Sequence, residues 1–372
     1  MALDIVKAKG NYLYSREGKK YLDIIGGISV CNVGHGRKEV LDAINKQAND
    51  YLHIMVYGEL IQSPQTSYAE KITNHLPEAL NCVYFTNSGA EATEGAMKLA
   101  KRVTGRHEII ACNNSYHGST QGALSIIGDE YWRNAYRPLL PGIWHYDHNS
   151  QELIDAINEK TACVIIEPIQ AEVGIGIPTI EWMQQLSAKC EATGTLLIID
   201  EIQCGFGRTG TFWGFEHFNI IPDIILLGKA LGGGMPLGAF VSSYNNMQAF
   251  TDNPVLGHIT TFGGHPVSCA AGAAAMDIII EDKLLEEIPE KEALFHQLLQ
   301  HNKINAVRSK GLLMAVELEN PTAVLACIDQ CLKKGLFTDW FLFAPHCIRI
   351  APPLTITREE IKTACEIITS CL

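Results

Sequence analysis

The sequence predicts an α/β protein built on a mainly parallel sheet, and two observations support this fold class. First, five short apolar runs alternate with helical patterns, as the buried strands of a parallel sheet do. Second, the 372 residues, of which 47% are apolar, are enough for one large α/β domain and a smaller one. The runs are CVYF (82–85), EIIAC (108–112), CVII (163–166), LLII (196–199) and DIILL (223–227).

The first two thirds of the chain contain most of the predicted strands. Near the amino terminus, two short strands flank a turn at Glu17-Gly18, and a helix follows over 36–48. Strand, loop and helix then alternate, and two of the helices stop at Gly105 and Gly194. This alternation predicts a sheet covered by helices on both faces.

The last third of the chain is more helical. After residue 266 come an Ala-rich helix, a charged helical stretch, a strand pair and a final helix that begins after Thr357. We expect a large domain at 46–265 and a small α+β domain in which 1–45 joins 266–372.

Composition and charge exclude several classes of protein. The 29 basic and 41 acidic residues give a net charge of -12, with no Lys/Arg run, so we expect no nucleic-acid or membrane partner. No apolar stretch reaches roughly 18 residues, and the start lacks a signal peptide. The twelve cysteines show neither CxxC spacing nor a Cys/His cluster, so we expect no metal site. These features predict a soluble, cytoplasmic protein.

A lysine and a carboxylate stand where two of the apolar runs end. Lys229 follows 223–227, where partial burial would favour the neutral amine that forms a Schiff base with a carbonyl. Asp200 follows 196–199 and needs a cationic partner, which a protonated pyridine nitrogen would supply. Gln203 is placed to contact a ring hydroxyl. The first two residues also have a plain interpretation: Lys229 as a surface lysine, and Asp200 as a helix cap or part of a structural salt bridge.

Three further runs end at groups suited to the same cofactor. Asn87-Ser88-Gly89-Ala90 lies between a strand and a helix, where free N–H groups and the helix dipole bind phosphate. Ser88 also fits a simple N-cap with Glu91 as its partner. Tyr116 offers a flat face for ring stacking, although buried tyrosines are common. His117 and Glu167 are assigned to the same site, and the set predicts pyridoxal 5'-phosphate.

Several motifs, in one order, resemble the class III aminotransferases, the family of acetylornithine, ornithine and 4-aminobutyrate aminotransferases. The resemblance extends over nearly the whole chain and implies the fold type I architecture of pyridoxal-phosphate enzymes. It also implies a homodimer with sites at the subunit interface. The motifs are NSGAEATEGAMKLA, SYHGST, EPIQAEVGIGIP, LLIIDEIQCGFGRTG, PDIILLGKALGGGMPLGA, TTFGGHP and IRIAPPL.

The resemblance implies a role for each cofactor residue. Lys229 matches the lysine that binds the cofactor aldehyde, Asp200 the partner of the ring nitrogen, and Gln203 a contact near the ring oxygen. Tyr116 matches the stacking aromatic, and Thr261 the threonine that reaches the phosphate of the neighbouring subunit's cofactor. The phosphate cradle corresponds to Ser88, Gly89 and Ala90.

Substrate residues are implied in the same way. Arg349 matches the arginine that holds a substrate carboxylate, unless it is structural. Glu172 matches its gate, which pairs with Arg349 while an ω-amine donor is bound and moves away for a dicarboxylate. Thr260 lies near the substrate, and Ile28 matches the aliphatic residue of acetylornithine and 4-aminobutyrate enzymes.

One departure leaves the donor open. Ser119 stands where those enzymes commonly have an arginine that grips a substrate carboxylate, and a neutral hydroxyl does not replace that ion pair. Arg133 and Arg137 are candidates to supply the charge. Acetylated or free ornithine, 4-aminobutyrate, another ω-amino acid and a diamine all remain open.

The sequence therefore predicts a ping-pong aminotransferase that moves an amino group from an ω-amino donor to 2-oxoglutarate. One alternative is an aminomutase of the glutamate-1-semialdehyde kind, which needs no external keto acid. A non-catalytic binding protein on the same fold is another. A nucleotide-dependent oxidoreductase is more distant, since no GxGxxG follows a first strand.

Overall fold

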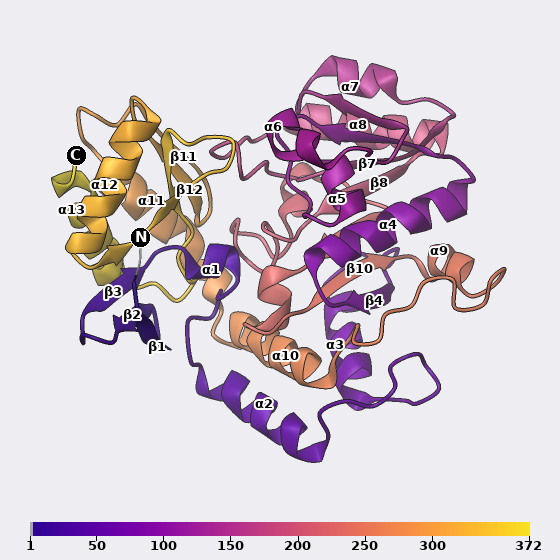
Figure 1. Cartoon of the computed structure of the whole chain (residues 1–372), viewed down its shortest axis with the longest axis horizontal. Helices are drawn as coiled ribbons and strands as arrows, with labels where there is room; N and C mark the ends of the chain where they lie inside the picture. Colours follow the sequence, from indigo (N-terminus) through magenta and orange to yellow (C-terminus); the bar gives the residue numbers. More distant parts are fainter. Residues whose placement is uncertain (1–2) are drawn as a thin grey trace.

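The computed structural model describes residues 3–372 and contains three sheets (Figure 1). The largest has seven strands in the order β4-β10-β9-β8-β7-β5-β6, and every neighbouring pair is parallel except those of β10. This confirms the mainly parallel sheet. Its strands are β4 (Cys82–Thr86), β5 (Glu108–Cys112), β6 (Ile143–Tyr146), β7 (Thr161–Ile166), β8 (Leu196–Asp200), β9 (Ile224–Leu227) and β10 (Gly238–Ser242).

All five predicted apolar runs are strands of this sheet. Because β10 is antiparallel to both β4 and β9, those two strands run in the same direction. The carboxyl ends of β4, β5, β7, β8 and β9 therefore meet at one edge of the sheet. The polar residues that follow them in the sequence are brought together at this edge, as expected for a parallel sheet.

Helices cover both faces of the large sheet. On one face, α4 (Gly89–Thr104) packs Ala96 and Leu99 against alternate side chains of β5, β7 and β8. On the other, α8 (Ile180–Thr193) packs Met183 and Leu186 against the intervening side chains. Burial on both faces explains the uninterrupted apolar runs. Both helices end at a left-handed glycine, Gly105 (φ 68°) and Gly194 (φ 64°), as predicted.

The two ends of the chain share the second sheet. It contains β1 (Ile5–Lys9), β2 (Tyr12–Ser15) and β3 (Lys20–Asp23), and its fourth strand is β13 (Leu336–Phe337), which lies beside β3 and parallel to it. The third sheet has the order β11-β12-β15-β14. Figure 1 shows both termini on the same side of the molecule. The pairing of β13 with β3 joins the two ends of the chain in one sheet, and the division at 1–45, 46–265 and 266–372 stays a prediction. The third sheet consists of β11 (Ala306–Lys310), β12 (Leu313–Glu317), β14 (Asp339–Trp340) and β15 (Cys347–Ile350).

The remaining helices connect these layers. Helix α10 (Pro266–Glu281) packs against α2 (Lys38–Asp50) and α3 (Ser63–Thr73), and it also contacts η3 (Lys229–Gly232). No helix within residues 3–372 is long and apolar enough to cross a membrane. The other α-helices are α5 (Gln121–Ser125), α6 (Glu130–Arg133), α7 (Gln151–Ala156), α9 (Tyr244–Met247), α11 (Ile288–Leu298), α12 (Pro321–Lys333) and α13 (Arg358–Ser370). The other 3-10 turns are η1 (Asn134–Tyr136), η2 (Gly214–Phe218), η4 (Gln248–Phe250) and η5 (Leu284–Glu287).

A left-handed turn lies beside η3. In α1 (Gly26–Ser29), all four residues have positive φ, including Ile28 at 62° and Ser29 at 61°. This conformation costs about 1–2 kcal/mol for each non-glycine residue. Asp23 holds the entry to the turn, because its Oδ1 accepts hydrogen bonds from the N–H groups of Ile25 and Gly26 at 2.9 Å each. Such strain is typical of residues near functional sites.

Candidate active site

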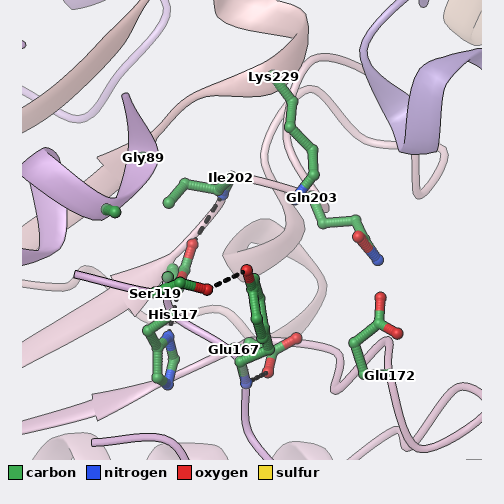
Figure 2. A pocket seen from close by; sticks show the side chains of 12 residues that line it. Gly89, His117, Ser119, Glu167, Glu172, Ile202, Gln203 and Lys229 are labelled. Carbon is green, nitrogen blue, oxygen red and sulfur yellow. Dashed lines mark hydrogen bonds and ion pairs between the residues drawn. The ribbon is translucent and has the colours of Figure 1, made fainter. Parts of the chain in front are cut away.

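A cavity of about 310 Å³ opens at the carboxyl edge of the large sheet (Figure 2). It brings together residues from five separate parts of the sequence, most of them predicted site residues. The lining residues are Gly89, Ala90, Tyr116, His117, Gly118, Ser119, Glu167, Glu172, Asp200, Ile202, Gln203 and Lys229.

Asp200 ends β8 and is only 4% exposed. Its Oδ2 lies 2.6 Å from Nδ1 of the buried His117, and its Oδ1 accepts the N–H of Ile202 at 3.0 Å. Burial alone would lower the pKa of His117, but the hydrogen bond and charge of Asp200 raise it above its ordinary value. The carboxylate is therefore held rigidly by His117, not by a lysine or arginine, and it remains able to stabilise a further positive charge.

Lys229 emerges directly after β9. It has a left-handed backbone (φ 47°), is half-buried, and extends into the cavity toward Gln203 (Figure 2). Burial lowers the pKa of its amine, and the nearby carboxylates only partly oppose this. A lowered pKa increases the fraction of the neutral, nucleophilic amine. This position rules out the plain interpretation of Lys229 as a surface lysine.

The amino-terminal end of α4 forms one wall of the cavity. Ser88 is the N-cap, and its Oγ accepts the N–H of Glu91 at 3.2 Å. The side chain of Ser88 therefore has the plain capping role and does not line the cavity. Gly89 and Ala90 do line it, and N–H groups in the first turn of a helix have no partner within the helix. Together with the dipole of a 16-residue helix, they form an anion site.

Tyr116 and Glu167 form the opposite wall. The Oε1 of Glu167 accepts the N–H of Tyr116 at 3.1 Å, and its Oε2 accepts the N–H of Ala171 at 3.2 Å. Burial raises the pKa of Glu167 to about 7; His117 opposes this shift and Asp200 adds to it. Tyr116 remains 36% exposed, and its hydroxyl is hydrogen-bonded to Ser119 Oγ at 3.0 Å. The ring face of Tyr116 is thus available to a ligand.

Sequence reasoning did not single out Ile202, which also lines the cavity. Its side chain lies so close to Gly89 that a Cβ at Gly89 would be 2.7 Å from Ile202 Cδ1. It supplies an aliphatic surface beside the anion site. The available signal was its position two residues after the strand-end Asp200, between two polar residues.

Arg349 does not line the cavity, because Glu172 covers it. The guanidinium donates to both carboxylate oxygens of Glu172, at 2.8 and 2.7 Å, and also to the carbonyl of Trp340. It lies 4.3 Å from the ring centroid of Phe341. Burial would raise the pKa of Glu172, but Arg349 holds it below its ordinary value. The pair is ionic, and Arg349 becomes accessible only when Glu172 moves.

Besides Ser88 and Arg349, three more predicted site residues and the two candidate arginines lie outside the cavity of a single chain. Thr261 is exposed, and Thr260 lines a second cavity of about 460 Å³. Ile28 is 37% exposed on the left-handed turn. Arg133 and Arg137 also lie outside the cavity.

One group of side chains suited to a metal ion occurs in the part of the chain that the structure describes: Glu317, His346 and Cys347. It lies away from the cavity, at the third sheet. The guanidinium of Arg308 donates to both Glu317 and Cys347, so a cation already neutralises this group.

Pyridoxal 5'-phosphate fits the residues that line the cavity. The helix end offers N–H groups for the phosphate, and Asp200 is placed for a cationic ring nitrogen. Lys229 supplies an amine of lowered pKa. The amide Nε2 of Gln203 is a buried donor with no hydrogen-bond partner within residues 3–372, as expected for a group that binds a ligand oxygen.

Comparisons with known proteins agree with this arrangement. The family model described as aminotransferase class-III matches residues 1–372. Two acetylornithine aminotransferases are each 37% identical in sequence to this chain. The alignment with the Methanosarcina mazei enzyme covers 98% of this chain and 91% of that enzyme, and the alignment with the Bacillus subtilis enzyme covers 97% of this chain and 93% of that enzyme.

Solved structures show the same fold. A transaminase from the marine bacterium Virgibacillus has a TM-score of 0.94 at 28% identity, covering all of this chain and 92% of its own. The ornithine aminotransferase of Toxoplasma gondii, with partial occupancy of PLP at its active site, has a TM-score of 0.92 at 27% identity, covering all of this chain and 90% of its own. The match over the full length establishes that this chain belongs to the class III aminotransferases, enzymes that depend on pyridoxal phosphate and have the fold type I architecture.

Proposed function

We propose that this enzyme transfers the amino group of an ω-amino donor to a 2-oxo acid, with Lys229 as its central catalytic residue. The observation that carries the proposal is the meeting of Lys229 with the Asp200–His117 pair in one cavity. Bound pyridoxal phosphate supplies an electron sink for the carbon that bears the amino group. The protein supplies orientation and proton transfer.

Each cofactor residue has a defined task in this proposal. Gly89 and Ala90 bind the phosphate through their N–H groups, and Ser88 fixes the helix end that presents them. Asp200, oriented by His117, keeps the ring nitrogen cationic, and Gln203 donates to the ring oxygen. The faces of Tyr116 and Ile202 enclose the ring. Glu167 holds the backbone of Tyr116 through its N–H.

Lys229 Nζ would have two tasks: it would hold the cofactor aldehyde, and it would accept the proton from the substrate carbon. The lowered pKa of the amine suits both, because each requires the neutral form. The left-handed backbone at Lys229, followed by η3, directs the side chain into the cavity.

Arg349 and Glu172 separate the two half-reactions. While the pair is closed, the positive charge of Arg349 is neutralised and an amine donor enters. When a 2-oxo acid enters, its carboxylate takes the place of Glu172 on the guanidinium fork. The family resemblance implies 2-oxoglutarate as the acceptor.

We further propose a homodimer in which Thr261 completes the neighbouring site. Thr261 is exposed on a loop beside several exposed apolar side chains, as expected for a surface that a second copy covers. Sedimentation of the purified enzyme tests the dimer, and Thr261→Ala should weaken cofactor affinity without changing its mass. The exposed apolar residues are Leu60, Ile61, Val255, Ile259 and Phe262.

Reduction of the enzyme with borohydride, followed by peptide mapping, tests the central assignment. The pyridoxyl label should lie on Lys229, and Lys229→Ala should abolish transamination. A label on another residue, or substantial turnover by Lys229→Ala, would overturn the proposal. Omitting the 2-oxo acid separates an aminotransferase from an aminomutase, since only the former stops after one turnover.

A further inference from the structure

The walls of the active-site cavity offer no free lysine or arginine for a second substrate carboxylate. Three carboxylates line the cavity, and two of them are already paired, Asp200 with His117 and Glu172 with Arg349. The amine of Lys229 holds the cofactor in the proposed function. Arg349 lies behind Glu172, and both of its terminal nitrogens are already bonded to that carboxylate. A substrate carboxylate therefore has one guanidinium available, and only by displacing Glu172.

Arg133 and Arg137 do not add a second cation. Both are paired with Glu130. Arg133 also donates to the carbonyls of Ser125 at 3.2 Å and Ile127 at 3.0 Å, which fixes it away from the cavity. Neither arginine is among the lining residues.

The segments that a second copy would contribute are also free of strong cations. In the proposed dimer these are the loops around Ile61 and Thr261. Residues 47–70 and 230–282 contain no lysine and no arginine. Association through these loops would therefore bring no lysine or arginine from either segment to the cavity.

Ser119 lines the cavity and is exposed (Figure 2). Its Oγ is hydrogen-bonded to the hydroxyl of Tyr116 at 3.0 Å, so this part of the wall offers only neutral hydroxyl groups. A carboxylate at the far end of a substrate would find no free lysine or arginine to pair with there, which is unfavourable. A neutral or cationic end would need no such partner.

We infer that this site accepts a substrate carboxylate beside the reacting carbon but not at the far end of the substrate, and that Ser119 is a specificity residue for this choice. The donors are then alkyl amines or diamines, not amino acids with a distal carboxylate. The acceptors are 2-oxo acids with a single carboxylate, such as pyruvate, in preference to the dicarboxylate 2-oxoglutarate. This inference rests on the proposed function, because it assumes that Arg349 holds the acceptor.

The first test measures the donor half-reaction of the cofactor-loaded enzyme, followed as the loss of its visible absorbance without any 2-oxo acid. The matched donors are 1,5-diaminopentane, pentylamine and 5-aminopentanoate, with ornithine and N-acetylornithine alongside. We expect the two amines to react at least about 10-fold more efficiently than the three carboxylates, a difference of about 1.4 kcal/mol. Carboxylate donors that react equally well would overturn the inference while leaving the proposed function intact.

The second test is a binding measurement that needs no turnover. Glutarate and butyrate, which carry two carboxylates and one, are titrated calorimetrically into the loaded enzyme, Ser119→Arg and the neutral control Ser119→Asn. Ser119→Arg should tighten glutarate by about 10- to 100-fold and leave butyrate within about twofold, since one charge-assisted contact is added. Ser119→Asn should change neither ligand more than about twofold.

Two results of the binding test would refute the inference. One is a glutarate affinity in the unaltered enzyme that already exceeds that of butyrate by about 10-fold. The other is a Ser119→Arg variant with unchanged glutarate binding. A failure of the proposed function is different: no donor of either kind would react, and borohydride would not label Lys229.

Discussion

Replacing Glu172 by glutamine isolates the charge of the arginine gate. The side chains of Glu172 and Arg349 are 7% and 3% exposed, and two hydrogen bonds of 2.8 and 2.7 Å join them. Removing one partner of a buried pair costs about 3–5 kcal/mol. The carbonyl of Trp340 and the ring of Phe341 still stabilise the guanidinium, so we expect the lower end, about 3 kcal/mol of unfolding free energy.

The same substitution should favour carboxylate ligands. In the unaltered enzyme an incoming carboxylate must displace Glu172, whereas in Glu172→Gln it meets an unneutralised Arg349. If most of the 3 kcal/mol is recovered on binding, butyrate should bind up to about 100-fold more tightly, and amine donors more weakly. Calorimetric titration with butyrate measures this effect, and urea unfolding measures the stability.

The pH dependence of stability provides a second measure of the same pair. The pKa of Glu172 is lower in the folded protein, so its contribution is present above the ordinary pKa of 4.5 and is lost as the pH falls through the folded value. Glu172→Gln should not show this loss of stability as the pH falls. Glu359→Gln, which removes an exposed partner of Lys362, is the control and should change stability by less than about 0.5 kcal/mol. Unchanged butyrate affinity together with unchanged stability would refute the gate.

Three further predictions concern Gly118, Ile28 and Glu201. Gly118→Ala should weaken cofactor affinity at least about 10-fold in a fluorescence titration, because the new Cβ would lie 2.6 Å from the Cβ of Ala90. The control is Gly105→Ala, at a left-handed glycine with open space around it, which should cost about 1 kcal/mol of stability and leave cofactor affinity unchanged. Ile28→Gly should relieve left-handed strain and raise the unfolding free energy by about 1 kcal/mol while weakening donor binding; a loss of stability would contradict this. Burial raises the pKa of Glu201 from 4.5 to about 8, so the folded protein retains a proton that the unfolded chain loses, and stability should fall from pH 5 to 8. If the free energy of unfolding, measured with urea, falls equally with pH in the enzyme and in Glu201→Gln, that assignment is wrong.

Much of the site could be predicted because one physical rule places its residues. Parallel strands that are buried on both faces appear in a sequence as short apolar runs, and their carboxyl ends meet at one edge. Asp200 and Lys229 lie 29 residues apart in the sequence, yet β8 and β9 are neighbours in the sheet, so both reach the same cavity. Tyr116 and Glu167 reach it from β5 and β7 for the same reason.

The features that residue patterns alone did not predict depend on contacts between separate layers, and the pairing of Arg349 with Glu172 was implied only by the family resemblance. Arg349 belongs to the third sheet, and its pairing with Glu172 joins that sheet to the loop after β7. No periodicity within either segment encodes this contact. The left-handed Ile28 follows two glycines that signal a turn, but the handedness of a β-branched residue there is set by the surrounding hydrogen bonds. For Ser88 two roles were open, and the structure assigns the side chain to the cap.

The three carboxylates of the cavity stay buried for different reasons, and this difference orders their chemistry. Asp200 is held by the imidazole of His117, whose pKa it raises. Glu172 is ionised because it is paired with Arg349. In the proposed function it leaves the guanidinium only when a ligand carboxylate takes its place. Glu167 has two backbone N–H groups and no lysine or arginine partner, so its pKa lies near neutrality. In the proposed function, Asp200 would serve the cofactor, Glu172 would serve the substrate, and Glu167 would support the wall between them. Of the three, Glu167 has no cationic side chain bonded to it, so it would repel a second substrate carboxylate above about pH 7 and less strongly once it takes up a proton.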